Sequence, residues 1–254
     1  MTRMNALTQL CLDFGRRRWE HVLGAAYLFL LAIPLAAQTV RPLIDENVVK
    51  APGKQASGRV EYVNDSLEDL VVTMNLQSYT VSDTGELSYR PLDSDIHVKL
   101  STMSFRIPAK QNYYVYYEAS ADKLPSWFVV YGTFSGFKAR TQAGFKIQVT
   151  LPHTVYLLSK YHVQKDELIL RKAEYHPNLK KIVVRVDNIG PSFGRVLEAD
   201  ASSGKGKMEQ GGFPLFPHSE RQVEIPWENS EDPDKLVLHL ETFKVEQKIR
   251  NVAQ

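Results

Sequence analysis

The sequence predicts an all-β protein with two sandwich domains in tandem behind an N-terminal export signal. Three observations support this prediction: one apolar segment near the N-terminus, many short alternating segments after it, and an internal repeat of one strand pattern. Alternation with a period of two places side chains on opposite faces of a strand. Short strands at this spacing, bounded by turn residues and without helical periodicity, are typical of immunoglobulin-like β-sandwich domains.

The apolar segment has the pattern of a signal peptide. Residues 16–18 are three arginines, and the uncharged segment 22–37 follows them, with Pro34 near its end and small residues after it. A positive cluster, an apolar core and small terminal residues are the features recognised for export and cleavage. Because a membrane helix needs roughly 20 apolar residues, we expect removal of residues 1–37. An uncleaved membrane anchor is the alternative.

Residues 1–37 also carry the charge imbalance and the only cysteine. The whole chain of 254 residues has a formal net charge of +2, and this segment holds four arginines against two acidic residues. The mature chain is then close to neutral, which does not favour nucleic acid as a partner, since that binding needs clustered lysines and arginines. Without Cys11 it has no thiol for a disulfide, for nucleophilic catalysis or for a metal site.

Alternating segments divide the mature chain into two halves. In the first half the expected strands cover residues 59–64, 70–79, 96–100, 112–118, 127–134 and 145–151. In the second half they cover residues 167–172, 182–188, 195–199, 221–225 and 236–243. The junction near residues 159–164 lacks the glycine- and serine-rich composition of a flexible linker. We therefore expect immunoglobulin-like domains at residues 38–160 and 161–254.

An internal repeat supports two similar domains. Residues 60–64 (VEYVN) are echoed by residues 184–188 (VRVDN), and each segment alternates and ends at an asparagine suited to a turn. Downstream, Ile107-Pro108 and Phe216-Pro217 each precede a strand whose apolar residues follow at the same offsets. The shared spacing predicts the same hairpin in both halves.

Motifs for catalysis are absent. The sequence contains no nucleophile elbow, no zinc-protease helix, no phosphate-binding loop and no dinucleotide fingerprint. The histidines of the mature chain show no metal-ligand spacing; they are His97, His153, His162, His176, His218 and His239. The acidic segment 228–234 lacks the ligand pattern of a calcium loop, and we interpret it as a solvated loop. We expect no enzyme activity, no cofactor and no metal.

Two strands carry more information. Residues 113–117 place tyrosines on both faces of one strand, so one face is expected to pack while the other offers an exposed aromatic surface that can bind a partner. Residues 145–151 alternate without a break, with Phe145, Ile147, Val149 and Leu151 on one face. In the middle of a sheet these side chains line a core, whereas on an open edge the same strand can pair with a partner and donate them.

With these residues the chain resembles the periplasmic chaperones of chaperone-usher pilus assembly, the PapD-like family. The matching pieces are residues 60–64, 70–79 with the turn 83–85, Ile107-Pro108, 127–134 and 145–151 continuing through 154–158. The resemblance implies two immunoglobulin-like domains and a role in capping pilin subunits by donor-strand complementation. The donor residues it implies are Phe145, Ile147, Val149 and Leu151.

The resemblance departs from the family at one site. The family anchors the subunit's terminal carboxylate with a lysine just after the alternating strand and an arginine on the first strand. Here Thr154 takes the lysine position, with His153 beside it, and Asn47 or Val48 lies near the arginine position. We list Thr154 and His153 as candidate contacts to the subunit terminus. They lack formal charge and with it the strongest, charge-assisted hydrogen bonds.

These observations predict a periplasmic, non-enzymatic chaperone that binds pilin-like or other exported subunits, with an outer-membrane usher as a further partner and no membrane contact after signal cleavage. A structural or adhesin-like envelope module, whose edge strand never donates, is the alternative.

Overall fold

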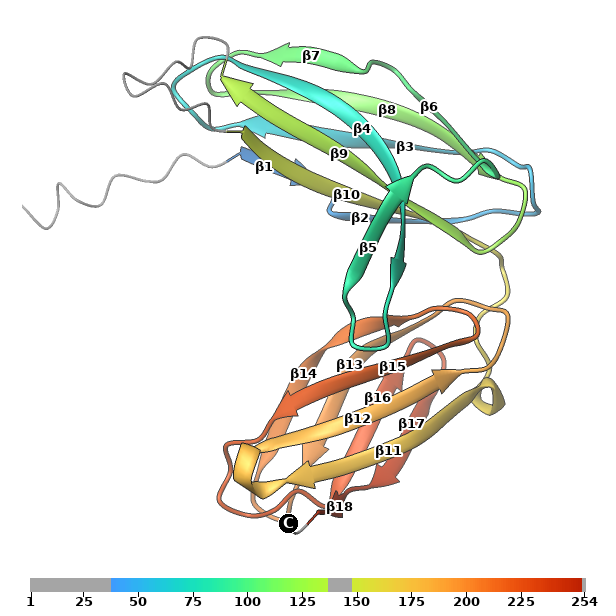
Figure 1. Ribbon diagram of the computed structural model, residues 1–254, viewed down its shortest axis with the longest axis vertical. Coiled ribbons are helices and arrows are strands. Elements are labelled where there is room, and N and C mark those ends of the chain that lie inside the picture. The colour runs from blue at the N-terminus through green and yellow to red at the C-terminus, as the bar shows by residue number, and fades with distance from the viewer. Residues whose placement is uncertain (1–37, 137–147, 253–254) are drawn as a thin grey trace, which may run out of the picture. The chain divides into compact units, whose positions relative to one another are not determined.

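The computed structural model of the protein describes residues 38–136 and 148–252. Residues 38–254 form one compact unit, in which two β-sandwiches follow each other along the chain (Figure 1). In the described ranges no helix is long and apolar enough to cross a membrane. The expected signal peptide, residues 1–37, lies outside the described residues.

The first sandwich consists of two sheets. One sheet has the order β1 (Gln38–Arg41), β3 (Ala56–Asn64), β8 (Gln111–Ala121), β6 (Ile96–Leu100). The other has the order β2 (Ile44–Val48), β10 (Gln148–Leu158), β9 (Ser126–Gly136), β4 (Leu70–Val81), β5 (Leu87–Pro91), and β7 (Ser104–Ile107) also pairs with β4. The first strand therefore changes sheets between β1 and β2.

The second sandwich also consists of two sheets. One has the order β15 (Ser219–Pro226), β12 (Lys181–Asn188), β11 (Leu168–His176), β18 (Arg250–Asn251). The other has the order β14 (Lys207–Leu215), β13 (Gly194–Ser202), β16 (Lys235–Leu240), β17 (Lys244–Lys248). Two short 3-10 helices, η1 (Lys165–Glu167) and η2 (Pro177–Leu179), precede and follow β11. The all-β prediction with two immunoglobulin-like sandwiches is confirmed.

The tyrosine-rich strand β8 shows how alternation selects the first core. Tyr117 is buried, whereas Tyr114 and Tyr116 on the opposite face are 39% and 57% exposed. Tyr113 stacks on Phe105 with ring centroids 4.3 Å apart. One face of the strand thus packs and the other remains in solvent, as a two-layer sandwich requires.

The core of the second sandwich is closed by Trp227, which is fully buried. Its indole Nε1–H donates a hydrogen bond of 2.8 Å to the carbonyl of Glu231. A buried indole needs such an acceptor. The acidic segment 228–234 is a loop between β15 and β16, and this contact holds it over the core.

Each strand that alternation predicts overlaps an observed strand, although the bounds of several differ. The strand expected at 236–243 ends at Leu240, and the one expected at 145–151 begins outside the described residues. Strands β1, β2, β5, β7, β14, β17 and β18 were not predicted. Most of these are short edge strands with little burial, so they lack the apolar alternation that marks a half-buried strand.

The repeated asparagines have equivalent roles in the two sandwiches. Asn64 is buried at the end of β3, and its Nδ2 donates to the carbonyls of Ile107 and Pro108, each at 3.1 Å. Its Oδ1 accepts from the Ser66 N–H at 3.0 Å, which closes an Asx turn.

Asn188 repeats this arrangement at the end of β12. Its Nδ2 donates to the carbonyl of Leu215 at 3.2 Å, and its Oδ1 accepts from the Gly190 N–H at 3.1 Å. In both sandwiches one buried amide joins the end of one strand to the proline-containing turn that starts its neighbour. The internal repeat in the sequence therefore corresponds to a repeated polar contact.

Replacing Asn64 with alanine should lower the free energy of unfolding by about 1–3 kcal/mol, because buried carbonyls and an N–H lose their partner. Chemical denaturation measures this change. The control is Asn112→Ala on the exposed outer face of β8, which should stay within about 0.5 kcal/mol of the unsubstituted protein. Equal effects of the two substitutions would contradict the structural role of Asn64.

Candidate functional site

The strand β10 has one side that is only partly paired. On one side it pairs with β9 from Gln148 to Leu157. On the other side it pairs with β2 in parallel, but only from Thr154 to Leu158. Among the described strands none pairs with the remaining part, Gln148 to His153, on that side. This part of β10 is an open edge.

Backbone hydrogen bonds show which polar groups face the open edge. The N–H of Thr154 donates to the carbonyl of Leu43 at 2.8 Å, so the backbone groups of Thr154 point toward β2. In an antiparallel ladder every second residue has this direction. Gln148, Thr150 and Pro152 therefore direct their backbone groups to the open side.

Two further observations fit this direction. Thr150 lies opposite Thr133 of β9 with the hydroxyls 3.0 Å apart, as expected for a closely spaced, non-hydrogen-bonded pair. Proline has no N–H and is tolerated where that group would face an open edge, which explains Pro152 in the middle of a strand. The edge thus offers N–H groups at Gln148 and Thr150 and carbonyls at both residues and at Pro152.

The side chains on this edge alternate as the sequence predicts. Val149 and Leu151 are half-buried and pack against the first core, while Gln148 and Thr150 are exposed. A hollow of about 220 Å³ lies beside Val149 and is also lined by Leu70, Phe134 and others. The apolar row therefore faces the rim of its own sandwich. The other two candidate donor residues, Phe145 and Ile147, lie outside the described residues.

Other edges in the described part of the chain carry features that discourage strand addition. The edge strand β17 alternates charges at Lys244, Glu246 and Lys248. The edge strands β14 and β5 contain Pro214 and Pro91. Charged residues and prolines on an edge oppose pairing with another chain. The first half of β10 carries no charged side chain between Gln148 and Pro152.

His153 immediately precedes Thr154, the residue at which β10 begins to pair with β2. Its side chain is fully buried, and its Nδ1 lies 2.7 Å from the carbonyl of Pro42, so Nδ1–H donates to that oxygen. The Nε2 atom has no hydrogen-bond partner among the described residues. Burial lowers the pKa of His153, and the hydrogen bond to Pro42 and the carboxylate of Asp45 oppose this shift only partly.

A hydrogen-bonded polar cluster lies near His153. The hydroxyl of Tyr117 donates to the carboxylate of Asp45, and Asn47 Nδ2 donates to the same hydroxyl at 3.0 Å. Asn47 thus points into the sandwich. Of the two candidate contacts to a subunit terminus, His153 has no exposed surface and only the half-buried Thr154 reaches the outside.

One charged pair near this place was not predicted. Arg195 of β13 binds Glu46 of β2, with Nε 2.8 Å from Oε1. The register of β2 and β10 places Glu46 opposite Tyr156, and the guanidinium of Arg195 lies 5.6 Å from the centre of the Tyr156 ring. Glu46 and Arg195 line a hollow of about 410 Å³. No sequence signal links Arg195 to Glu46, because they are 149 positions apart.

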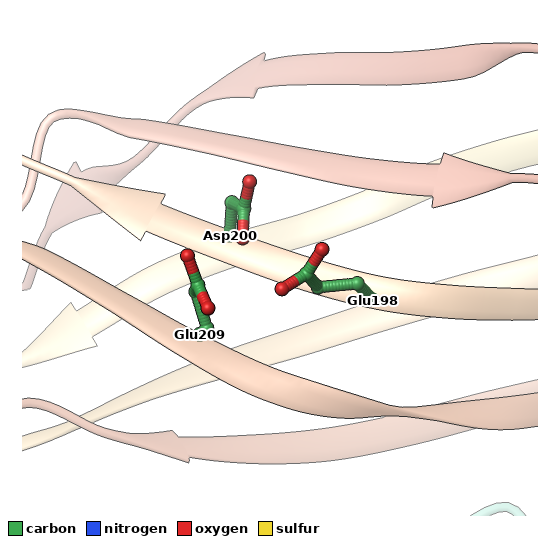
Figure 2. Close-up of side chains that lie close together, drawn as sticks. All are labelled: Glu198, Asp200 and Glu209. Carbon is green, nitrogen blue, oxygen red and sulfur yellow. The ribbon is translucent and has the colours of Figure 1, made fainter.

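An acidic group lies on the second sandwich. Figure 2 shows the side chains of Glu198 and Asp200 on β13 and Glu209 on β14, with carboxylate oxygens within 4.8 Å of one another. Asp200 accepts from His239 Nε2 at 2.9 Å and lies 3.2 Å from Lys207 Nζ, which also binds Glu209 at 2.5 Å. Lys207 and His239 therefore supply cationic or donor partners to this group.

His153 should make the stability of the protein depend on pH. Since its pKa is lower in the folded than in the unfolded chain, the stabilisation is present above the ordinary histidine pKa of about 6.5 and is lost as the pH falls below it. His153→Gln should flatten the profile between pH 7 and pH 5, by at most about 1.4 kcal/mol per pH unit. Denaturation at several pH values measures this, and parallel profiles for the two proteins would contradict it.

Removal of divalent metal should leave the thermal midpoint unchanged, because Lys207 and His239 already bind the carboxylates of Asp200 and Glu209. Thermal unfolding with and without a chelator measures this. A drop in the midpoint that Glu209→Gln abolishes would instead show metal binding by the acidic group.

Comparisons with known proteins give similarity in structure only. No family model matches the sequence, and no curated protein sequence matches it. A chain in the structure of the Salmonella enterica SafA pilin in complex with the SafB chaperone is 11% identical, with coverage of 85% of this chain and 98% of that chain and a TM-score of 0.53. The YadV chaperone is 13% identical, with coverage of 83% and 98% and a TM-score of 0.51. The chain thus has the two-sandwich fold of PapD-like pilus chaperones, as its resemblance predicted.

Proposed function

We propose that this protein is a periplasmic, non-enzymatic chaperone that binds pilin-like subunits by strand addition at the open edge of β10. The observation that carries this proposal is the unpaired backbone from Gln148 to Pro152. An extended partner segment that pairs there satisfies its own backbone groups and those of the edge together. The fold shared with SafB and YadV supports the same role.

The apolar side chains beside this edge support a partner that contributes apolar surface. Val149 and Leu151 are half-buried at the rim of the first core, so a covering strand would remove their remaining surface from water. Each Å² of apolar surface buried contributes roughly 25 cal/mol. A subunit that lacks one strand of its own sandwich gains most from this contact, because it closes its exposed core at the same time. In this proposal Phe145 and Ile147 extend the donor row beyond the described residues.

Recognition of the subunit terminus is proposed to differ from that of the family that the sequence resembles. Thr154 replaces the expected lysine, and the nearby Arg195 is bound by Glu46. At these two positions the site therefore offers the hydroxyl of Thr154 and an arginine that is already paired, rather than a free lysine, to a carboxylate. Affinity at this edge is proposed to rest mainly on backbone pairing and apolar contact.

The predicted signal at residues 1–37 supports export, and with it the periplasm as the compartment and an outer-membrane usher as a further partner. The competing function, a structural envelope module, is favoured by one observation: Val149 and Leu151 already pack against their own core. The two functions differ in whether the edge backbone of β10 is needed for binding.

Thr150→Pro tests this directly. It removes an N–H that faces the open edge but takes no hydrogen bond from the ladder with β9, so the free energy of unfolding should change by about 1 kcal/mol or less. Capture of a pilin-like subunit encoded beside this chain, measured by co-purification, should fall at least about tenfold, the equivalent of 1.4 kcal/mol.

The matched control is Thr150→Val, which keeps the N–H and the strand propensity and should retain capture. Val149→Thr should reduce capture while costing about 0.5–1.5 kcal/mol of stability, since the side chain is half-buried. Full capture by Thr150→Pro would rule out strand addition at this edge and leave the structural module.

A further inference from the structure

The hairpin between β4 and β5 reaches a second open edge in the molecule. Its turn is closed by two backbone hydrogen bonds, from the Ser82 N–H to the Glu86 carbonyl at 2.9 Å and from the Gly85 N–H to the Ser82 carbonyl at 3.0 Å. The strand β5 is exposed along its whole length. Figure 1 shows this hairpin as the teal ribbon that carries the label β5. The turn therefore lies at the end of a projecting arm.

The turn contacts β15, which is an edge strand of the second sandwich. The N–H of Gln222 donates to the carbonyl of Asp83 at 2.7 Å. This N–H points away from β12, because an N–H that donates to the turn cannot also donate to a carbonyl of β12. The backbone N–H groups of Glu220 and Glu224, two residues before and two residues after Gln222, point to the same open side.

Arg221 and Gly85 fit closely beside that hydrogen bond. The Nη1 of Arg221 lies 3.5 Å from the carbonyls of Ser82 and of Asp83. Gly85 has a φ of +94°, and a Cβ added there would lie 2.1 Å from the guanidinium of Arg221. Glycine is favoured here by its backbone conformation, and a Cβ would in addition push the flexible guanidinium of Arg221 away from the carbonyls of the turn.

The charges on β15 do not protect this edge by repulsion. Glu220 binds Arg185 at 2.8 Å, and Glu224 binds Lys181 at 2.7 Å, both on the neighbouring strand β12. Carboxylates neutralised by their own sheet repel an incoming strand less than free ones. The hairpin turn is the contact that occupies the open side of β15.

We propose that the turn 82–86 is a guard that closes the β15 edge against strand addition by a second copy of this chain. This inference is independent of the proposed client, since it concerns the free protein and its self-association.

The test compares two glycines, Gly85 and Gly53, that both have a positive φ. Gly53 also has a positive φ, +74°, but a Cβ added there meets no atom within 4 Å. Gly85→Ala should speed hydrogen exchange of the Gln222 amide at least tenfold and produce concentration-dependent dimers in size-exclusion chromatography with light scattering. Gly53→Ala should leave both readouts unchanged.

A second substitution separates the contact from backbone strain. In the background Arg221→Ala the clash at position 85 is removed, so adding Gly85→Ala should speed Gln222 exchange much less than it does beside Arg221. In the unsubstituted protein the Gln222 amide should exchange at least tenfold more slowly than those of Glu220 and Glu224. Equal exchange at the three amides, or a freed Gln222 amide in a protein that stays monomeric, would overturn the guard.

Discussion

The place where the chain changes sheets, between β1 and β2, determines how much of β10 is paired among the described strands. β1 pairs with β3 in one sheet, and after Pro42 and Leu43 the chain continues as β2 beside β10 in the other. Only five residues of β2 then remain to pair with a strand of eleven residues. Among the described strands the first half of β10 is therefore left without a partner on this side, and the hydrogen bond from Thr154 to Leu43 marks where pairing begins.

This crossing is held by partly buried polar contacts, one of which involves the carboxylate of Asp45. His153 donates to the Pro42 carbonyl, and Tyr117 joins Asp45 and Asn47 on the strand that follows. Buried polar groups stabilise a fold only when they are paired. Only one nitrogen of the His153 ring has a hydrogen-bond partner among the described residues, and the crossing therefore favours the neutral imidazole. The same burial keeps His153 away from any partner at the surface.

Several other edge strands in the described part of the chain carry features that oppose pairing with a further strand. Prolines and alternating charges occupy β14, β5 and β17, and the turn 82–86 meets β15. The buried asparagines Asn64 and Asn188 have a separate role, because each bonds the segment that leads into a neighbouring strand, β8 in the first sandwich and β15 in the second. A protein with an unprotected edge strand can pair with another copy of itself, and such features oppose that pairing.

The sequence alone determined the class of fold, the repeat and the strands that bury one face. Residues 60–64, 184–188 and the strand through Val149 and Leu151 show alternation that depends only on neighbours along the chain. It did not predict β2, β5 or β17, since exposed edge strands carry no apolar pattern.

The tertiary structure decided which edge stays open, because pairing depends on where distant segments meet. It placed His153 in the core and Thr154 at the surface, although they are adjacent in sequence. It also joined Arg195 to Glu46 and Asp83 to Gln222. Such contacts form between residues more than a hundred positions apart, and neither spacing nor composition encodes them; they follow from the packing of whole sheets.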